Sequence, residues 1–468
     1  MRVAHACWSC MLVMHVGYAS GHSRWSCKLV MHVGHASWSC MLILHVGHEC
    51  WSCIFCYVDI NLIPKDEANS PIYIKNGKLH NPEKIQVGNY SIIALKWDVG
   101  DNSLLICGNG NNIVKLSKSE IKFECTSNNT LIESGTNKKF ILNDKKCSTN
   151  IKVKVKDANK TCDFGNIIRI GFENENDFYE YIEVCYHYGS ASTKYTKHII
   201  SGKAKQLATN SSIVIPYKRP TFSKDGLPFH ARDGEPYKKA NQISRFENIT
   251  QNDGSSAFGT SSFLAIGHLT PVIDGIFNYL KQATMFYINA APEWQDINAG
   301  NWKRVENIAR CTALTLNDDL EVYTGIAGIL ELPNTENELQ ELYLKTIGNN
   351  PLKKKPRLNS DTIPKETQDD IIPVPKYFWK VLKYKDKAIA FITLNNPYAV
   401  QINTIDPCND ICSQYGYSTN GTNQAFHNFK TGRTNCCQVN DLVTKFPNDV
   451  PKELGLLKVN ILRYQDCQ

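Results

Sequence analysis

The sequence lacks the features that define several common protein classes. Past residue 60 it contains no Cys-x-x-Cys pair, the spacing that many structural zinc sites use. The same region has no uncharged apolar run of about 18 residues, so nothing there predicts a membrane-spanning helix. A strong excess of one charge is also missing, since 52 Lys and Arg residues stand against 45 Asp and Glu residues, a net charge of +7. This mild basicity is compatible with a polyanionic partner but does not identify one.

Cysteine, by contrast, is abundant, with 18 residues in a chain of 468. Past residue 60 the cysteines are scattered singly, apart from Cys408 with Cys412 and the adjacent Cys436 and Cys437. Scattered cysteines favour disulfides over structural zinc. Each Asn-x-Ser/Thr sequon can arise by chance, but together with the cysteines they favour a secreted, extracellular glycoprotein with no membrane anchor in its mature form. The six sequons begin at Asn89, Asn128, Asn159, Asn210, Asn248 and Asn420.

The first 56 residues form a tandem repeat. The segment WSCMLVMHVGYAS (Trp8–Ser20) is followed by two close copies and by a truncated WSCIFC. Such a period is too short for a solenoid or propeller unit. Histidine is concentrated here, so a Cys/His metal tract is one interpretation. A duplicated or mistranslated gene segment is the interpretation we favour. From Met41 the segment also has the apolar length of a signal peptide, without its basic start.

Residues 57–165 have the sequence pattern of a small Cys-containing all-β domain. Short β-favouring runs, among them YSIIALKW, NIVKLS, IKFEC and KKFIL, are separated by turns rich in Asn, Gly, Asp and Lys. Nothing in this region indicates catalysis. The region contains four cysteines that could form two disulfides, in a pairing that the sequence leaves open: Cys107, Cys125, Cys147 and Cys162.

Residues 166–468 read as strands, then helices, then strands again, followed by a Cys-rich C-terminal tail. The two helical candidates span 271–283 and about 298–315, and this order of elements predicts an α+β fold. Two passages, 216–237 and 351–360, are expected to be surface loops. The basic run within 351–360 could follow phosphates, but a solvated loop is the better interpretation.

One polar stripe stands out in the second helical candidate. Asn298, Trp302, Glu306 and Arg310 recur at every fourth position, which on a helix places them along one face. A buried stripe at this spacing would be apolar. This one carries an amide, a carboxylate and a guanidinium downstream of a strand that ends in His268, a combination suited to phosphodiester chemistry with a metal ion.

Each of these residues also has an ordinary structural interpretation. Glu306 and Arg310 could be a surface ion pair, worth a few tenths of a kcal/mol. Asn298 could only cap the helix, and Trp302 could belong to the core. His268 could be a packed residue at the end of a strand. Spacing alone does not decide between these interpretations.

A resemblance of the motif residues to a known family favours the functional interpretation. GHLTP followed by YINAAPEWQDINAGNWKRVE resembles the DNA/RNA non-specific endonuclease family, in particular its secreted insect-type branch. The family pattern is Arg-Gly-His, then Asn-x-x-Pro-Gln, then Asn-x-x-x-Trp-x-x-(Leu/Val)-Glu. The resemblance implies a ββα-metal (His-Me finger) nuclease domain on a central antiparallel sheet, preceded here by the small all-β domain. It does not extend to the repeats of residues 1–56.

The resemblance also implies roles for single residues. His268 corresponds to the general base and Asn298 to the one direct protein ligand of Mg²⁺, for which Mn²⁺ could substitute. Asn289 is expected beside the histidine, Glu306 in the water shell of the metal and Arg310 near the scissile phosphate. The partners would be the backbone phosphates of DNA and RNA, contacted with few base-specific interactions.

Two positions depart from the family pattern. Ile266 stands where the motif has arginine, and Glu293 stands where it has glutamine. The first change removes a charge-assisted contact to phosphate, and the second adds negative charge near a polyanion if Glu293 faces the site. We therefore expect a secreted Mg²⁺-dependent endonuclease of reduced activity. Two alternatives stay open: a weakly catalytic protein that binds extracellular nucleic acid, and a structural or inhibitory protein that acts through its β domain.

Overall fold

The protein is described from a computed structural model of the chain. The expected loop 351–360 lies outside the described residues, as does most of 216–237. The structure describes residues 2–4, 10–19, 22–31, 45–46, 49–50, 55–126, 129–136, 138–143, 145–175, 177–190, 192–207, 217, 235–344, 372–400, 406–417, 425–455 and 460–464.

Two compact units divide the chain. The first unit comprises residues 1–63, 73–105 and 120–145, and the second comprises 64–72, 106–119 and 146–468. Each unit is therefore built from segments that are separated in the sequence, and each is described by itself below. The predicted domain limits 1–56, 57–165 and 166–468 stay predictions.

The first unit is built on strands. Its core packs Trp97 edge-on against Phe123, which stacks on Phe140. One sheet places β10 (Tyr90–Asp98) between β6 (Phe55–Asp59) and β9 (Glu83–Val87). A six-stranded sheet runs in the order β14 (Lys138–Lys139), β13 (Thr130–Glu133), β12 (Glu120–Thr126), β11 (Ser103–Ile106), β7 (Ile72–Lys75) and β8 (Lys78–Leu79).

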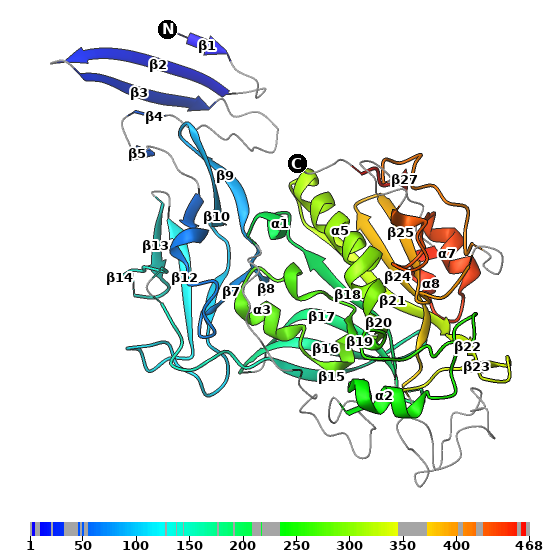
Figure 1. Cartoon of the computed structure of the whole chain (residues 1–468). Coiled ribbons are helices and arrows are strands. Elements are labelled where there is room, and N and C mark those ends of the chain that lie inside the picture. Colours follow the sequence, from blue (N-terminus) through cyan, green and yellow to red (C-terminus); the bar gives the residue numbers. More distant parts are fainter. Residues whose placement is uncertain are drawn as a thin grey trace. The chain divides into compact units, whose positions relative to one another are not determined.

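Parts of the N-terminal repeats also form strands (Figure 1). The strand β2 (Cys10–Ala19) pairs antiparallel with β1 (Arg2–Ala4) and with β3 (His22–Met31). A second, short antiparallel pair joins β4 (His45–Val46) to β5 (Glu49–Cys50). After the repeats, a 3₁₀ turn, η1, spans Ile60–Leu62. Neither pairing forms a repeating solenoid among the described residues.

The second unit is organised by a nine-stranded sheet whose neighbouring strands are antiparallel, except that β27 pairs parallel with β25. This central sheet and the helices around it give the expected α+β class. The sheet runs in the order β15 (Lys154–Cys162), β16 (Gly165–Asn174), β17 (Asp177–His187), β18 (Ser192–Ile200), β21 (Leu320–Ile329), β24 (Pro375–Tyr384), β25 (Lys387–Leu394) and β26 (Thr434–Cys437), with β27 (Asn460–Ile461) beside β25.

The two faces of this sheet differ in chemistry because side chains alternate along each strand. One face carries Tyr195, Tyr323 and Trp379 into an apolar core that includes residues of α7 (Val439–Lys445) and α8 (Lys452–Gly455). The register places Thr196 opposite Thr324 and Thr324 opposite Lys380 on the other face. A polar row therefore lies buried in the middle of the sheet.

The longest helix, α5 (Lys303–Leu316), contacts β18 and β21 (Figure 1). It buries Val305, Ile308 and Ala309, and it ends at Asn317, whose φ of 53° is in the left-handed region. Among the described residues, no helix is both long and apolar enough to cross a bilayer. The other helical segments before α5 are α1 (Ala204–Leu207), η2 (Glu235–Tyr237), α2 (Lys239–Arg245), η3 (Val272–Asp274), α3 (Asn278–Ala283), η4 (Tyr287–Asn289), α4 (Gln295–Ile297) and η5 (Asn298–Trp302).

Both predicted helices are interrupted. The candidate 271–283 forms the short turn η3 and then α3, and the candidate 298–315 begins as a π-helical turn before it becomes α5. In the first unit the run KKFIL forms a strand only at its two lysines. The run NIVKLS forms no strand, because Ile113 makes only an isolated bridge and turns follow it. A short hairpin, β22 (Glu331–Pro333) with β23 (Leu339–Glu341), completes the described elements apart from the β19–β20 hairpin described below.

The cysteines form disulfides, as predicted, but the four cysteines of the β region do not form two disulfides among themselves. Only Cys107–Cys147 stays within the expected set of four. Cys125 bonds to Cys56, at the end of the repeats, and Cys162 bonds to Cys185 across the strands β15 to β17. In the C-terminal tail, the described bonds are Cys408–Cys437 and Cys412–Cys436.

Candidate active site

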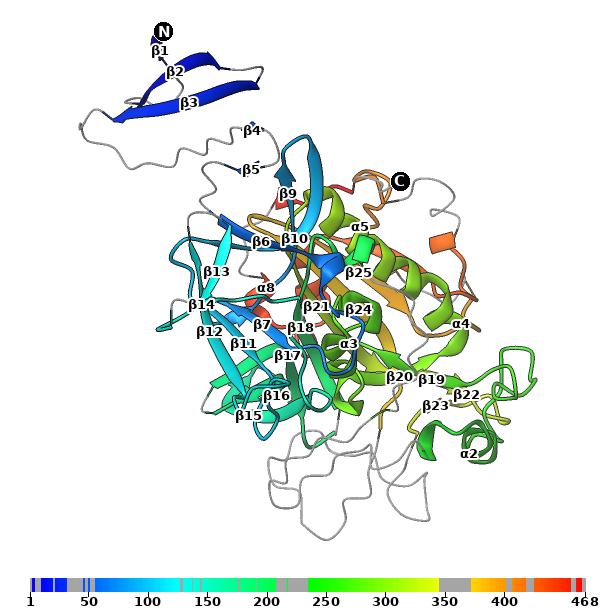
Figure 2. The same ribbon diagram turned by 90° about the vertical axis from the view of Figure 1, so that its left-hand side faces the viewer.

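A short hairpin carries the histidine of the motif. The strand β19 (Leu264–His268) pairs antiparallel with β20 (Ala290–Trp294), and α4 continues directly from β20 (Figure 2). The register sets Ile266 opposite Pro292 and His268 opposite Ala290. Ile266 and His268 therefore share one face of the hairpin, whereas Gly267 and Glu293 belong to the other.

His268 is half-buried among tyrosines and a methionine. The hydroxyl of Tyr217 lies 2.8 Å from its Nε2 atom and 2.9 Å from Nδ1, and the Met285 sulfur lies 3.4 Å from Nε2. Tyr217 and Tyr237 both lie against the ring of Tyr287. Burial lowers the pKa of His268 to about 4, so the imidazole is neutral at neutral pH and can accept a proton.

Asn289 fixes the chain immediately after His268. Its side-chain Oδ1 accepts a hydrogen bond from the backbone N–H of Thr270, and its Nδ2 donates to the carbonyls of Thr270 and Thr284, each at 2.9 Å. Its own carbonyl accepts from the Leu269 N–H at 2.9 Å. Asn289 is fully buried, so this amide stabilises the loop that follows the histidine, which is the neighbourhood expected from the motif.

The interpretation of Asn298 as a helix cap is not supported by its backbone conformation. The Asn298 backbone is already helical, with φ −55° and ψ −46°, and the residue at the N-cap position of the segment Asn298–Trp302 is Ile297. The regular stripe expected from the four-residue spacing is broken two residues later, because Gly300 has non-helical angles. A side chain at Gly300 would meet the backbone oxygen of Thr431 at 2.7 Å, so glycine permits this kink. Asn301 holds the turn by donating to the carbonyls of Ala425 and Gly432.

Within the described residues, the side chains of Asn298 and Glu306 have no hydrogen-bond or ion-pair partner. Both residues are half-buried. Burial raises the pKa of Glu306 to about 7, although the charges of Lys380 and Arg310 oppose the rise. Glu306 is therefore not the partner of a surface ion pair with Arg310, and that interpretation is wrong. Trp302 is fully buried and belongs to the core, as its ordinary interpretation proposed.

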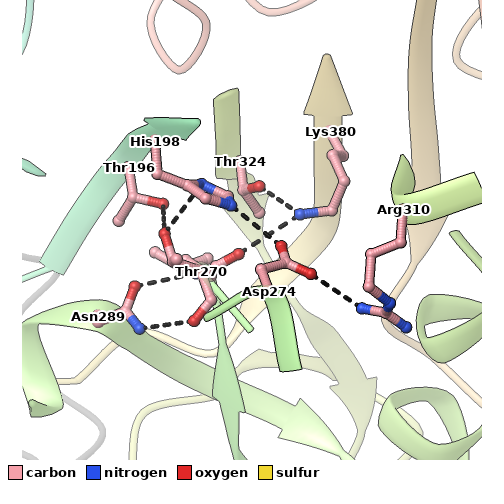
Figure 3. Close-up of polar contacts among 9 residues, drawn as sticks. Thr196, His198, Thr270, Asp274, Asn289, Arg310, Thr324 and Lys380 are labelled. Carbon is pink, nitrogen blue, oxygen red and sulfur yellow. Dashed lines mark hydrogen bonds and ion pairs between the residues drawn. The ribbon is translucent and has the colours of Figure 1, made fainter. Parts of the chain in front are cut away.

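Arg310 belongs to a buried polar network (Figure 3). Its Nη1 donates to Asp274 Oδ1 at 2.9 Å, and His198 Nε2 lies 3.0 Å from Asp274 Oδ2. The chain continues from His198 Nδ1 to the Thr270 hydroxyl at 3.3 Å, and from there to the Thr196 hydroxyl at 3.1 Å. Both carboxylate oxygens of Asp274 and both ring nitrogens of His198 have a partner.

The charges in this network have definite states. Burial alone would raise the pKa of Asp274, but the hydrogen bond from His198 and the charge of Arg310 outweigh it and lower the pKa. Asp274 is therefore a carboxylate. Burial lowers the pKa of His198 despite the nearby Asp274, so His198 is neutral and donates its Nε2–H. The expected place of Arg310 near the scissile phosphate stays a prediction.

Lys380 is a buried cation that the sequence-based analysis missed. It lies on β24, 1 % exposed, donates to the Thr324 hydroxyl and lies 3.4 Å from the carbonyl of Leu269 (Figure 3). Burial lowers the pKa of Lys380 to about 8, against the opposing effects of Glu306 and Asp274. A lysine in phase with Phe378 and Leu382 on a buried strand face was the signal that could have revealed it.

Glu293 faces the protein interior and not the solvent. It is fully buried, and neither of its carboxylate oxygens has a hydrogen-bond partner among the described residues. Burial raises the pKa of Glu293 well above its ordinary value, the negative charge of Glu306 raises it further, and Lys380 opposes both. Glu293, which replaces the glutamine of the family pattern, is thus a buried carboxyl group without a hydrogen-bond partner among the described residues.

The structure thus brings some of the predicted residues together directly. Asn289 bonds to the loop after His268, and Glu306 lies within the electrostatic field of Arg310 and Glu293. No hydrogen bond or ion pair joins His268 to Asn298 or Glu306 within the described residues. Amide and carboxylate oxygens without protein partners are the donors that Mg²⁺ and Mn²⁺ prefer, so Asn298 and Glu306 fit a divalent cation.

Comparison with known proteins decides the family. The family model of DNA/RNA non-specific endonucleases matches residues 163–442, more than half of the chain. The chain belongs to this family. It is a nuclease, and it shares with the family a dependence on a divalent metal and nucleic acids as substrates.

Relatives of this endonuclease are salivary proteins of insects. The chain is 28% identical over 394 residues to a salivary endonuclease of Lutzomyia longipalpis, covering 82% of each chain. It is 28% identical over 422 residues to the salivary protein Tsal2A of Glossina morsitans morsitans, covering 86% of this chain and 94% of the relative. A salivary endonuclease of Culex quinquefasciatus is 24% identical over 404 residues, covering 83% and 90%.

A solved structure of the EndoG/EndoGI complex also matches, with 13% identity and a TM-score of 0.29. The match covers 48% of this chain and 75% of the other.

Proposed function

We propose that the protein is a secreted, Mg²⁺-dependent endonuclease that hydrolyses phosphodiester bonds of DNA and RNA with little sequence specificity. Its catalytic elements are the β19–β20 hairpin and the helix α5, in the order of a ββα-metal nuclease. The observation that carries the proposal is that Asn298 and Glu306 have no hydrogen-bond or ion-pair partner within the described residues, on the helical segments η5 and α5 that follow the hairpin carrying His268. Mn²⁺ is expected to substitute for Mg²⁺.

Asn298 and Glu306 are the residues that would hold the cation, Asn298 directly and Glu306 through bound water. When present, the ion neutralises charge that develops on the phosphate and on the leaving oxygen. The rigid support for Asn298 comes from the bonds of the next turn, where Asn301 is tied to two backbone carbonyls. A donor that is fixed before binding loses little freedom when it binds.

His268 would take the proton from the attacking water. Its neutral state at neutral pH follows from its burial, and a neutral imidazole is the form that a general base requires. Asn289 keeps the following loop in place through three hydrogen bonds with its side chain. Asn289 is therefore a positioning residue for His268.

Recognition of the substrate would rest on its phosphates. A cation and basic side chains act on the backbone, which DNA and RNA share, and they do not distinguish bases. Few base-specific contacts are expected, and cleavage would then be largely independent of sequence.

Secretion is supported by the disulfides and by the relatives. The described residues contain five disulfides, which persist in oxidising compartments. Two of the predicted glycosylation sites, Asn89 and Asn159, are exposed. The relatives of this chain are salivary proteins, and the same route is proposed for this protein.

A second function has its own support. Ile266 offers no charge on the face that it shares with His268, and Arg310 is already engaged by Asp274. Both observations reduce the positive charge available to a phosphate at the site. The alternative is therefore a protein of the same family that binds extracellular nucleic acid and cleaves it inefficiently.

Nicking of supercoiled plasmid and degradation of single-stranded RNA test the proposal. We expect cleavage with Mg²⁺ that a chelator stops, and a loss of about 10²–10⁴-fold in His268→Ala, the range typical of general-base catalysis. Binding of nucleic acid by His268→Ala should equal that of the natural chain at matched salt, because His268 is not a phosphate contact.

The outcomes separate the two functions. Salt-dependent binding without Mg²⁺-dependent cleavage would establish the binding protein. A loss smaller than tenfold in His268→Ala would show that another group accepts the proton.

A further inference from the structure

Glu293 has an environment that its motif position does not explain. Its side chain is fully buried, both carboxylate oxygens lack partners among the described residues, and it lies on the strand that leads into α4. Its Oε2 atom lies over Gly267, so close that a Cβ atom there would be 2.5 Å away. The glycine before His268 thus leaves the space that this carboxylate occupies.

A buried carboxylate without a donor or a counter-ion carries a large free-energy cost. The buried cation Lys380 does not relieve it directly, because the Lys380 ammonium is bonded to Thr324 and the Leu269 carbonyl. Lys380 makes no ion pair with Glu293 within the described residues. The oxygens of Glu293 are therefore free to accept a ligand that is not part of the chain.

The other groups that interact with Glu293 indicate which ligand. The charged group with the strongest effect on Glu293 is Glu306, whose carboxylate is also unpartnered. The single turn α4 separates Glu293 from Asn298, the third oxygen donor without a partner. Two carboxyl groups and an amide are hard oxygen donors, and the two carboxyl groups would carry a charge of −2 once a divalent cation displaces their protons.

We propose that Glu293 is an additional oxygen donor to the divalent cation that Asn298 and Glu306 hold. This inference rests on the proposed function and refines it, because the family pattern has a neutral glutamine at this position. Replacing an amide by a carboxylate adds a full negative charge to the site. The protein should therefore bind divalent cations more tightly than a site with glutamine, while attracting the phosphate less strongly.

Binding of Mn²⁺ to the full-length protein, free of nucleic acid, tests this inference. Electron paramagnetic resonance of unbound Mn²⁺ gives the dissociation constant without any cleavage assay. We expect Glu293→Gln, which keeps the size of the side chain and restores the motif residue, to weaken binding by about tenfold or more. Glu336→Gln is the matched control, because Glu336 is exposed and should bind Mn²⁺ like the natural chain.

Asn298→Ala separates this inference from the proposed function. If Asn298→Ala loses Mn²⁺ while Glu293→Gln binds as tightly as the natural chain, the role of Glu293 is refuted and the metal site stands. If the natural chain and Asn298→Ala bind Mn²⁺ equally, the proposed metal site itself is refuted. Tighter binding by Glu293→Gln also refutes the inference.

Folding is controlled with a second substitution. Glu293→Asp keeps the charge on a shorter side chain, so its affinity should lie between those of the natural chain and Glu293→Gln. Circular dichroism and the thermal midpoint of each variant show whether the fold is intact. An affinity of Glu293→Asp equal to that of a folded Glu293→Gln would show that charge at this position has no effect on the cation.

Discussion

Two groups of polar side chains lie around the hairpin and α5, and they differ in how completely they are satisfied. The first is the network of His198, Asp274 and Arg310, in which each carboxylate oxygen of Asp274 has its own partner. The second consists of Asn298, Glu306 and Glu293, none of which has a hydrogen-bond or ion-pair partner among the described residues. His198, Asp274, Arg310 and Glu293 are buried, whereas Asn298 and Glu306 are half-buried, so in the second group only Glu293 is both shielded from water and without a partner.

The difference separates residues that stabilise the fold from residues that are available for chemistry. In the network the oxygens of Asp274 are already engaged, and removing one member leaves charges buried without partners. An open group costs free energy in the folded protein, and such a cost is commonly retained at functional sites. The two groups should therefore respond in opposite ways to substitution.

The largest effect is expected from a substitution in the second group, which comprises Asn298, Glu306 and Glu293. Asn298→Ala should abolish detectable cleavage and weaken Mg²⁺ binding, because it removes the donor assigned to the cation. The same substitution should change the free energy of unfolding by less than about 1 kcal/mol, since the amide has no partner in the protein. Rates with Mg²⁺ and urea unfolding of the same preparation provide both measurements. Cleavage at the natural rate would refute the role of Asn298.

The closed network should show the reverse pattern. Asp274→Ala leaves Arg310 and His198 buried without their partner, and we expect a loss of about 3–5 kcal/mol in the free energy of unfolding. Asp406→Ala is the matched control, because Asp406 pairs with Arg433 at the surface, where an ion pair contributes about 0–1 kcal/mol. Equal losses in the two variants would show that burial of the network is unimportant.

The pH dependence of that stability has a defined sign. The pKa of Asp274 is lower in the folded protein than in the unfolded chain, so its contribution is present above the unfolded value. It is lost as the pH falls through the folded value. Urea unfolding of the natural chain and of Asp274→Ala at a series of acidic pH values should therefore give curves that converge as the pH decreases.

The sequence predicted the parts of this site that depend on local spacing. The motif residues identified the family, and His268 lies at the end of a strand, as expected. The alternation of the β-favouring runs and the order of elements gave the α+β class. The spacing of four did not reveal the kink at Gly300, because the contact with Thr431 that accompanies it comes from a distant part of the chain.

The network could not be predicted, since its members come from separate strands and loops. His198 lies on β18 and Lys380 on β24, on either side of β21 in the sheet, whereas Asp274 comes from the turn η3. The pairing of Cys125 was not predicted for the same reason, because its partner Cys56 lies outside the region assigned to the β domain. The strand β15, on the N-terminal side of the predicted limit at residue 165, pairs with β16.

Ile266→Arg adds a cation to the face of β19 that carries His268. Arginine at this position would share the face of His268 and reach a phosphate there. One charge-assisted contact is worth roughly 1.5–3 kcal/mol, so we expect a cleavage rate about ten to a hundredfold higher with little change in the Mg²⁺ requirement. Ile266→Lys is a useful comparison, since it adds charge without the planar guanidinium. No gain from Ile266→Arg in a folded protein would refute the idea that this position limits activity.

The smallest expected effect concerns the hydroxyl of Tyr217, which lies within hydrogen-bond distance of both nitrogens of His268. Burial raises the pKa of Tyr217 well above its ordinary value, so the hydroxyl keeps its proton and donates to the neutral imidazole. A donor to the neutral form disfavours protonation. Tyr217→Phe should therefore raise the pKa of His268 from about 4 by less than about one pH unit, the equivalent of one ordinary hydrogen bond.

Because the base must be neutral, activity is lost as the pH falls through the pKa of His268. The acidic limb of kcat/KM against pH should accordingly move to higher pH in Tyr217→Phe, while the plateau changes by less than tenfold. Tyr237→Phe is the control, since Tyr237 lies against the same Tyr287 ring but makes no hydrogen bond to His268 within the described residues. A limb that moves equally in both variants would assign the effect to the packing of the tyrosines, and a limb that stays in place in both would show that the Tyr217 hydroxyl does not affect the base.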